Sequence, residues 1–155
     1  VEADECTYNL HIMLRFELEV ELIEGRLQVP ELPDAWNAKV KDYLGLDVPD
    51  DARGCLQDIH WSHASFGYFP TYSLGNLYAA QLCNQIEADL PGLWADVRAG
   101  RFAPLLQWLR THVHHVGRRQ LGPAIVEAAV GAPPSPEPYL GYLESKYRAL
   151  YGLRE

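Results

Sequence analysis

The chain has 155 residues, of which 48% are hydrophobic, so it is long and apolar enough for one domain with a packed core and is not a disordered tail. Its formal net charge is −8, from 13 Lys and Arg against 21 Asp and Glu. This balance argues against nucleic acid or an anionic membrane as a partner, because both reward clustered positive charge. No run of about 18 apolar residues is present, so we expect no membrane span.

Residues 2–24 carry a pattern that fits two structures. Polar and apolar residues alternate from Phe16 to Leu22, which is typical of a half-buried strand. Leucines also recur at every fourth position from Leu10 to Leu22, which is typical of a helix. The length without Gly or Pro favours a helix that ends at Gly25. On such a helix Asp4 would sit in the first turn, where the dipole favours a carboxylate, and this structural role competes with any role in a site.

Acidic side chains interrupt the apolar faces of this segment. Carboxylates on a buried helix need a partner or a water-filled cleft, because an unpaired buried charge is costly. The residues concerned are Glu17, Glu19, Glu21 and Glu24.

The next elements are predicted from Pro and Gly punctuation. A second helix begins at Pro33 and ends at Gly45, and a loop over residues 46–53 follows it. A third helix begins at Pro70, whose fixed φ suits a first turn, and runs to Leu90. Gly75 inside this helix indicates a close approach of another helix.

The remaining sequence predicts an all-α chain. Helices are expected over residues 91–100, 102–116, 123–129 and 139–150, with a stiff, Pro-rich connector over 133–138. The 102–116 helix ends in His112, His114 and His115, two of which lie three residues apart and can share a face. These imidazoles indicate either a metal site or a favourable interaction with the helix C-terminus, and we favour the second because no acidic ligand is adjacent.

The three cysteines, Cys6, Cys55 and Cys83, are odd in number and widely spaced. They form neither a C-x-x-C nor a zinc-finger pattern. We expect reduced, buried thiols in a cytoplasmic protein.

The stretch from residue 54 to residue 72 holds the most concentrated chemistry. It mixes amide, carboxylate, imidazole, indole, hydroxyl and phenol groups, whereas a core segment needs mainly Leu, Ile and Val. Each buried polar group costs about 1–3 kcal/mol if it is left unpaired, so folding alone does not favour this mixture. The stretch is therefore either a candidate site or a loop that satisfies its own backbone.

Five residues of this stretch match a known pattern, G-x-x-Q-D-x-H-W. They are Gly54, Gln57, Asp58, His60 and Trp61. Ala3 and Asp4 also match the end of an I-R-x-x-A-D pattern. On these motifs the chain resembles, over essentially its whole length, the carboxypeptidase Taq family of zinc metallocarboxypeptidases. The resemblance implies a helix over residues 2–24.

The metal-binding pattern of that family is missing here. The family holds zinc with an H-E-x-x-H helix and a downstream Glu, and it places this motif before I-R-x-x-A-D. No pair of His in this sequence encloses a Glu in that spacing. The chain therefore looks like the C-terminal part of such an enzyme, which agrees with its start at Val1. We expect no metal bound by this chain alone and a divalent metal, zinc, in the intact enzyme.

The resemblance implies a hydrolase that releases single amino acids from peptide C-termini, with residues 54–72, called the signature stretch below, lining its cleft. We expect His60, Tyr68 and Tyr72 to act as catalytic donors to the substrate. Gln57 and Asp58 are expected to orient His60. Trp61 is expected to wall the pocket.

The resemblance also implies partners. They are the C-terminus of a peptide substrate, the missing N-terminal part of the same protein and a second copy in a homodimer. Two alternatives remain open, a non-catalytic helical module that binds peptides or partners and a purely structural C-terminal domain.

Overall fold

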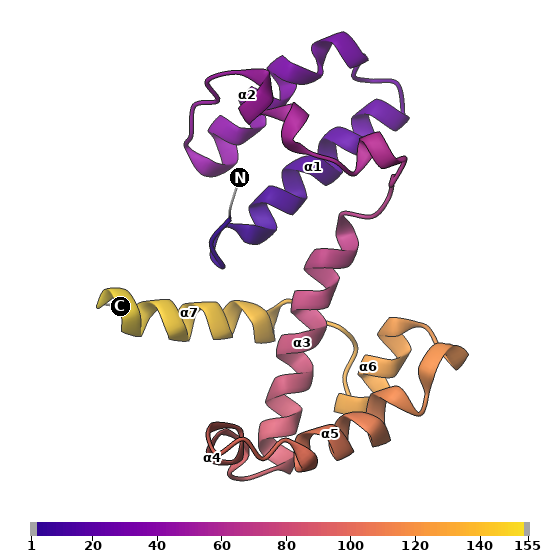
Figure 1. The fold of residues 1–155 in the computed structure, drawn as a ribbon, viewed down its shortest axis with the longest axis vertical. Coiled ribbons are helices and arrows are strands. Elements are labelled where there is room, and N and C mark those ends of the chain that lie inside the picture. The colour runs from indigo at the N-terminus through magenta and orange to yellow at the C-terminus, as the bar shows by residue number, and fades with distance from the viewer. Residues whose placement is uncertain (1–2, 154–155) are drawn as a thin grey trace. The chain divides into compact units, whose positions relative to one another are not determined.

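The computed structural model describes residues 3–153, and every regular element among them is helical, which confirms the predicted all-α class (Figure 1). None of these helices combines the length and the apolar character that crossing a bilayer requires. Contacts between Cα atoms divide the chain into two compact units, Val1–Leu74 and Gly75–Glu155.

In the first unit, helix α1 spans Tyr8–Ile23. It starts later than predicted, and residue 2, where the prediction began it, lies outside the described residues. Asp4 forms the turn before it, because its Oδ1 accepts the amide of Thr7 at 2.8 Å and its carbonyl accepts the amide of Tyr8 at 2.9 Å. The Thr7 amide lowers the pKa of Asp4 below its usual value. Gly25, with φ of 73°, follows the helix as predicted.

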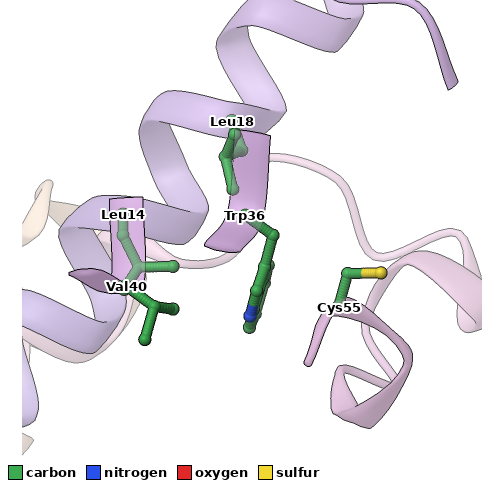
Figure 2. Packing of buried hydrophobic residues seen from close by; sticks show 5 residues of the cluster. All are labelled: Leu14, Leu18, Trp36, Val40 and Cys55. Atoms are coloured by element: carbon green, nitrogen blue, oxygen red, sulfur yellow. The ribbon is translucent and has the colours of Figure 1, made fainter. Parts of the chain in front are cut away.

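Helix α2 spans Leu32–Leu44 and ends at Gly45, which adopts the left-handed conformation expected of a helix-terminating glycine. Leu14 and Leu18, one turn apart on α1, are fully buried and pack in one cluster with Trp36 and Val40 of α2 (Figure 2). Cys55, from the short 3-10 helix η3 at Cys55–Gln57, completes this cluster. Burial of a Leu side chain contributes about 1.5–3 kcal/mol, so this core fixes α1 against α2 and the start of the signature stretch.

The second unit has a core cluster of its own, formed by Ile86, Leu93 and Trp108, against which some of its helices pack. The elements are the greater part of α3 at Pro70–Asp89, then α4 at Leu93–Arg98, α5 at Ala103–Leu109, η5 at Arg110–His114, η6 at Gly117–Arg119, α6 at Gly122–Val130 and α7 at Glu137–Tyr151.

The buried amide of Gln81 holds the connector before α7. Its Nε2 donates to the carbonyl of Pro133 at 2.9 Å, and its Oε1 accepts the amide of Ser135 at 3.2 Å. A buried side-chain amide thereby satisfies backbone groups that a Pro-rich segment cannot pair within itself.

Three expectations from the sequence are wrong. The predicted helix over residues 102–116 changes character at Arg110, where α5 gives way to the π-helical turn η5. A Cβ added to Gly75 would meet no heavy atom within 4 Å, so no other helix in residues 3–153 packs closely on this glycine. Cys6 is exposed and Cys83 is half-buried, so only Cys55 fits the expectation of buried thiols.

Candidate active site

The signature stretch is built of short turns rather than a long helix. Gly54 leads into η3, and a second 3-10 helix, η4, follows at Trp61–His63. A Cβ at Gly54 would lie 2.8 Å from Cγ1 of Val48 and 3.2 Å from the carbonyl oxygen of Asp50, so the tight entry to the stretch requires a glycine. The last residues of the stretch form the first turn of α3, which begins at Pro70 as predicted.

The imidazole of His60 is fixed at both of its nitrogens. Nδ1 lies 3.0 Å from Oδ1 of Asp58, and Nε2 lies 3.0 Å from the hydroxyl of Tyr72. Oδ1 of Asp58 also accepts the backbone amide of His60 at 2.8 Å. Because a carboxylate only accepts, we assign the proton of a neutral ring to Nδ1, which leaves Nε2 to accept from the Tyr72 hydroxyl.

Three aromatic rings surround the imidazole. Tyr68 stacks on it with centroids 6.1 Å apart, Phe69 lies at 4.9 Å and Tyr72 meets it edge-on at 5.8 Å. The side chain of His60 is 25% exposed, so part of the ring is open to a ligand. Burial, followed by the nearby Tyr68, Tyr8 and Asp58, raises the pKa of Tyr72, so its hydroxyl keeps its proton at neutral pH.

Arg15 holds the far side of Asp58, and the sequence analysis did not include it. Its Nε donates to Oδ2 of Asp58 at 2.8 Å, and its Nη1 donates to the carbonyl of His11 at 2.7 Å. Asp58 is almost completely buried, with 4% of its side chain exposed. Arg15 is the one Arg or Lys in the sequence of α1. Its isolation on a helix rich in glutamates was a signal from which its role could have been predicted.

Trp61 is part of the packed interior as well as the signature. Its ring meets Trp36 and Phe69 edge-on at centroid distances of 6.4 and 5.9 Å. Its indole N–H donates to Oε2 of Glu19 at 2.9 Å, and Glu19 is 4% exposed. The sequence predicted that a buried carboxylate on this helix needs a partner, and for Glu19 that partner is Trp61 of the signature stretch.

The other two predicted site residues lie away from the imidazole nitrogens. Gln57 ends η3, where its backbone amide donates to the carbonyl of Gly54 at 3.1 Å. Asp4 is exposed and makes its hydrogen bonds to Thr7. The structure thus gathers His60, Asp58 and Tyr72 into one hydrogen-bonded group, with Tyr68 stacked on the ring.

The residues present do not fit a metal ion. Over residues 3–153, no three His, Cys, Asp or Glu side chains come close enough together to hold one. Among the clustered histidines, His112 stacks on Trp108 at 4.2 Å and places Nδ1 2.9 Å from the Trp108 carbonyl. The imidazole of His112 therefore interacts with Trp108, four residues earlier in the chain.

Comparison with known proteins agrees with the signature. The family model of the carboxypeptidase Taq (M32) metallopeptidases matches residues 1–147. The chain belongs to this family.

Two curated relatives and one solved structure illustrate the similarity. Thermostable carboxypeptidase 1 of Thermus thermophilus is 50% identical over 152 residues, which are 98% of this chain and 30% of that protein. Carboxypeptidase 1 of Bacillus subtilis is 44% identical over 151 residues, 97% of this chain and 30% of that protein. The crystal structure of the M32 carboxypeptidase from Deinococcus radiodurans superposes with a TM-score of 0.92 at 45% identity, covering 98% of this chain and 31% of the other. The chain therefore spans about 30% of the length of these relatives.

Proposed function

We propose that this chain is part of a metal-dependent carboxypeptidase, in which it lines the cleft for the C-terminus of a peptide. Two findings support this proposal. One is family membership, and the other is the hydrogen-bonded group of His60, Asp58 and Tyr72, called the His60 group below. The observation that carries it is a partly exposed imidazole whose two nitrogens are held 3.0 Å from Asp58 and 3.0 Å from the Tyr72 hydroxyl. A fixed imidazole and phenol of this kind stabilise charge that develops during acyl transfer once one of them presents its hydrogen to the substrate.

In this proposal the metal, which we take to be zinc, is held by residues outside this chain. When bound, a metal of this kind polarises the scissile carbonyl and activates a water molecule. The residues of this chain have separate tasks, which are to bind the peptide, to orient it and to provide protons at defined atoms.

His60 and the two tyrosines are the proposed donors. The Tyr72 hydroxyl keeps its proton and can turn from Nε2 of His60 toward a substrate oxygen. When His60 takes up a second proton, Nδ1 still donates to Asp58 while Nε2, which faces the Tyr72 hydroxyl, becomes a donor as well. Tyr68 stacks on the ring and is 49% exposed, so we infer that its side chain can reach the peptide.

The remaining signature residues have supporting roles in this proposal. Asp58 fixes the orientation and tautomer of the His60 ring, a task that carboxylates commonly perform for functional histidines. Gln57 and Trp61 line the wall of the cleft, and Asp4 shapes the turn that begins α1.

The proposal is tested by comparing this chain alone with the complete enzyme, meaning this chain together with the residues that hold the metal. After dialysis, we expect less than stoichiometric zinc and no release of C-terminal amino acids from the chain alone, but both from the complete enzyme. One tightly bound zinc with hydrolysis by the chain alone would overturn the proposal and direct attention to His60, His63 and the histidines of residues 112–115. A complete enzyme that binds peptides without cleaving them would favour the non-catalytic peptide-binding module.

A further inference from the structure

Arg15 is fixed from three directions inside the first unit. Its Nε bonds to Asp58, its Nη1 bonds to the carbonyl of His11 in the preceding turn, and its guanidinium carbon lies 4.8 Å from the centroid of the Trp36 ring. Only 18% of its side chain is exposed. A planar guanidinium with several fixed donors satisfies such a site, whereas an ammonium group does not.

The two oxygens of Asp58 have different partners. Oδ2 accepts from Arg15, while Oδ1 accepts the backbone amide of His60 and lies 3.0 Å from Nδ1 of its ring. A carboxylate rotates about its terminal torsion with little restriction when nothing holds it. The bond from Arg15 removes that freedom and keeps Oδ1 directed at His60.

We propose that Arg15 is a positioning residue for His60, because it holds Asp58 in the one orientation that keeps the ring proton on Nδ1 and presents Nε2 to the Tyr72 hydroxyl. The catalytic consequence of this proposal rests on the proposed function of His60, while the effect on the ring tautomer does not. Removal of Arg15 leaves a buried carboxylate without its counter-charge, which must then reorient or bind a proton. In either case the group that accepts from Nδ1 of His60 changes. The ring nitrogen that carries the proton is then no longer fixed.

A second ion pair on α1 provides a matched control. Nζ of Lys39, from α2, lies 2.7 Å from Oε2 of Glu17, with 23% and 35% of the two side chains exposed. This pair joins α1 to α2 as Arg15 joins α1 to the signature stretch, but it does not touch Asp58 or His60. Lys39→Gln therefore removes a cation from the same helix pair without altering the His60 group.

The experiment measures the His60 tautomer and turnover in the complete enzyme labelled with ¹⁵N-histidine. In the wild type we expect ring nitrogen shifts of a single Nδ1–H tautomer for His60. Arg15→Gln should give a mixture of tautomers and lower kcat by about 10–100-fold, as loss of a residue that orients a functional ligand commonly does. KM should change much less, because the affected interaction stabilises the transition state. Lys39→Gln should change neither readout.

Arg15→Lys serves as the rescue variant and as the substitute if Arg15→Gln does not fold. It keeps the charge but cannot bond to Asp58 and to the His11 carbonyl in the geometry of the fork, so we expect a smaller but measurable loss of kcat, roughly tenfold. A folded Arg15→Gln or Arg15→Lys protein with wild-type tautomer and wild-type kcat would overturn the proposal and make Arg15 a structural anchor.

The two readouts separate this inference from the proposed function. A mixed tautomer with normal kcat would support the positioning by Arg15 and contradict the catalytic role of His60. An unchanged tautomer in the Arg15 variants, together with a strong loss of kcat in His60→Ala, would support the catalytic role and contradict the positioning.

Discussion

The buried carboxylate of Glu19 holds Trp61, although the two residues lie 42 positions apart in the sequence. Oε2 of Glu19 accepts the indole N–H at 2.9 Å, and Oε1 accepts the backbone amide of Gly67 at 2.6 Å. One side chain of α1 thereby fastens the signature stretch at two points on either side of its middle. The stretch is held against α1 by directed hydrogen bonds as well as by packing.

We predict that Glu19→Gln destabilises the protein by about 1.5–3 kcal/mol, because a hydrogen bond to a charged group contributes about that much. Glutamine keeps one acceptor oxygen, but its amide group then faces an N–H donor, so either Trp61 or Gly67 loses its partner. Chemical denaturation of the wild type and the variant measures the difference.

Glu87→Gln is the matched control for Glu19→Gln. Glu87 also accepts an indole N–H, from Trp94 at 2.7 Å, but it is exposed. Since water replaces what an exposed carboxylate loses, the change in stability should stay within about 0.5 kcal/mol. Equal losses in both variants would contradict the structural role assigned to Glu19.

Substitution of two glycines by alanine should give effects of opposite sign. Gly54→Ala places a methyl group against Val48 and the backbone of Asp50, and we expect a loss of about 1–3 kcal/mol from overpacking. Gly75→Ala meets open space inside α3 and should stabilise the protein by about 0.5–1 kcal/mol, because alanine is the better helix former. Melting temperatures that move in the same direction for both variants would contradict the packing described at these positions.

Glu17 should make part of the stability dependent on pH. Hydrogen bonds from Lys39 and then from the Tyr43 hydroxyl lower the pKa of Glu17 below its unfolded value of 4.5. A carboxyl group whose pKa is lower in the folded state contributes stability above the unfolded pKa and loses it as the pH falls through the folded one. We therefore expect Glu17→Gln to cost about 0.5–1 kcal/mol at pH 7, since the pair is partly screened by solvent.

The difference between wild type and Glu17→Gln should shrink as the pH falls below 4.5, and urea denaturation across this range measures it. Asp47→Asn is the control, because Asp47 pairs with Lys41 at 2.8 Å but is 89% exposed, and such pairs contribute little. A constant difference between wild type and Glu17→Gln down to strongly acidic pH would contradict the contribution assigned to the Glu17 charge.

Local signals in the sequence predicted the helix boundaries well where backbone chemistry decides them. Gly45 ends α2 because it reaches the left-handed region without strain, and Pro70 begins α3 because its φ is already helical. The start of α1 was misplaced because Asp4 bonds to Thr7 and forms a turn of its own before the helix begins.

The alternating glutamates of α1 were ambiguous for a physical reason. Glu17 and Glu21 both approach Lys39, whereas Glu19 faces Trp61 and Gly67. The carboxylates therefore have partners on different sides of one helix. As a result, glutamates occur at every second position, which is also the spacing of a half-buried strand. Such partners lie far away in the sequence, so a local pattern cannot identify them.

The candidate site could be predicted only where its residues lie close together in the sequence. His60, Asp58 and Tyr72 lie within one short stretch, and the structure brings them into hydrogen-bonding distance. Arg15, which precedes Asp58 by 43 positions, was missed because its partner depends on how α1 packs against the stretch.

The central claim is that His60 acts on the substrate rather than on the fold, and His60→Ala in the complete enzyme tests it most directly when kcat and melting temperature are measured on the same preparation. Asp58→Asn and Tyr72→Phe accompany it as tests of the two groups that hold the ring. We predict that His60→Ala lowers kcat by about 10²–10³, as loss of one preorganised donor does, with little change in melting temperature. Asp58→Asn should cost less, about 10–100-fold. A His60→Ala protein that melts at a much lower temperature but turns over normally per folded molecule would contradict the claim and make the signature stretch a scaffold.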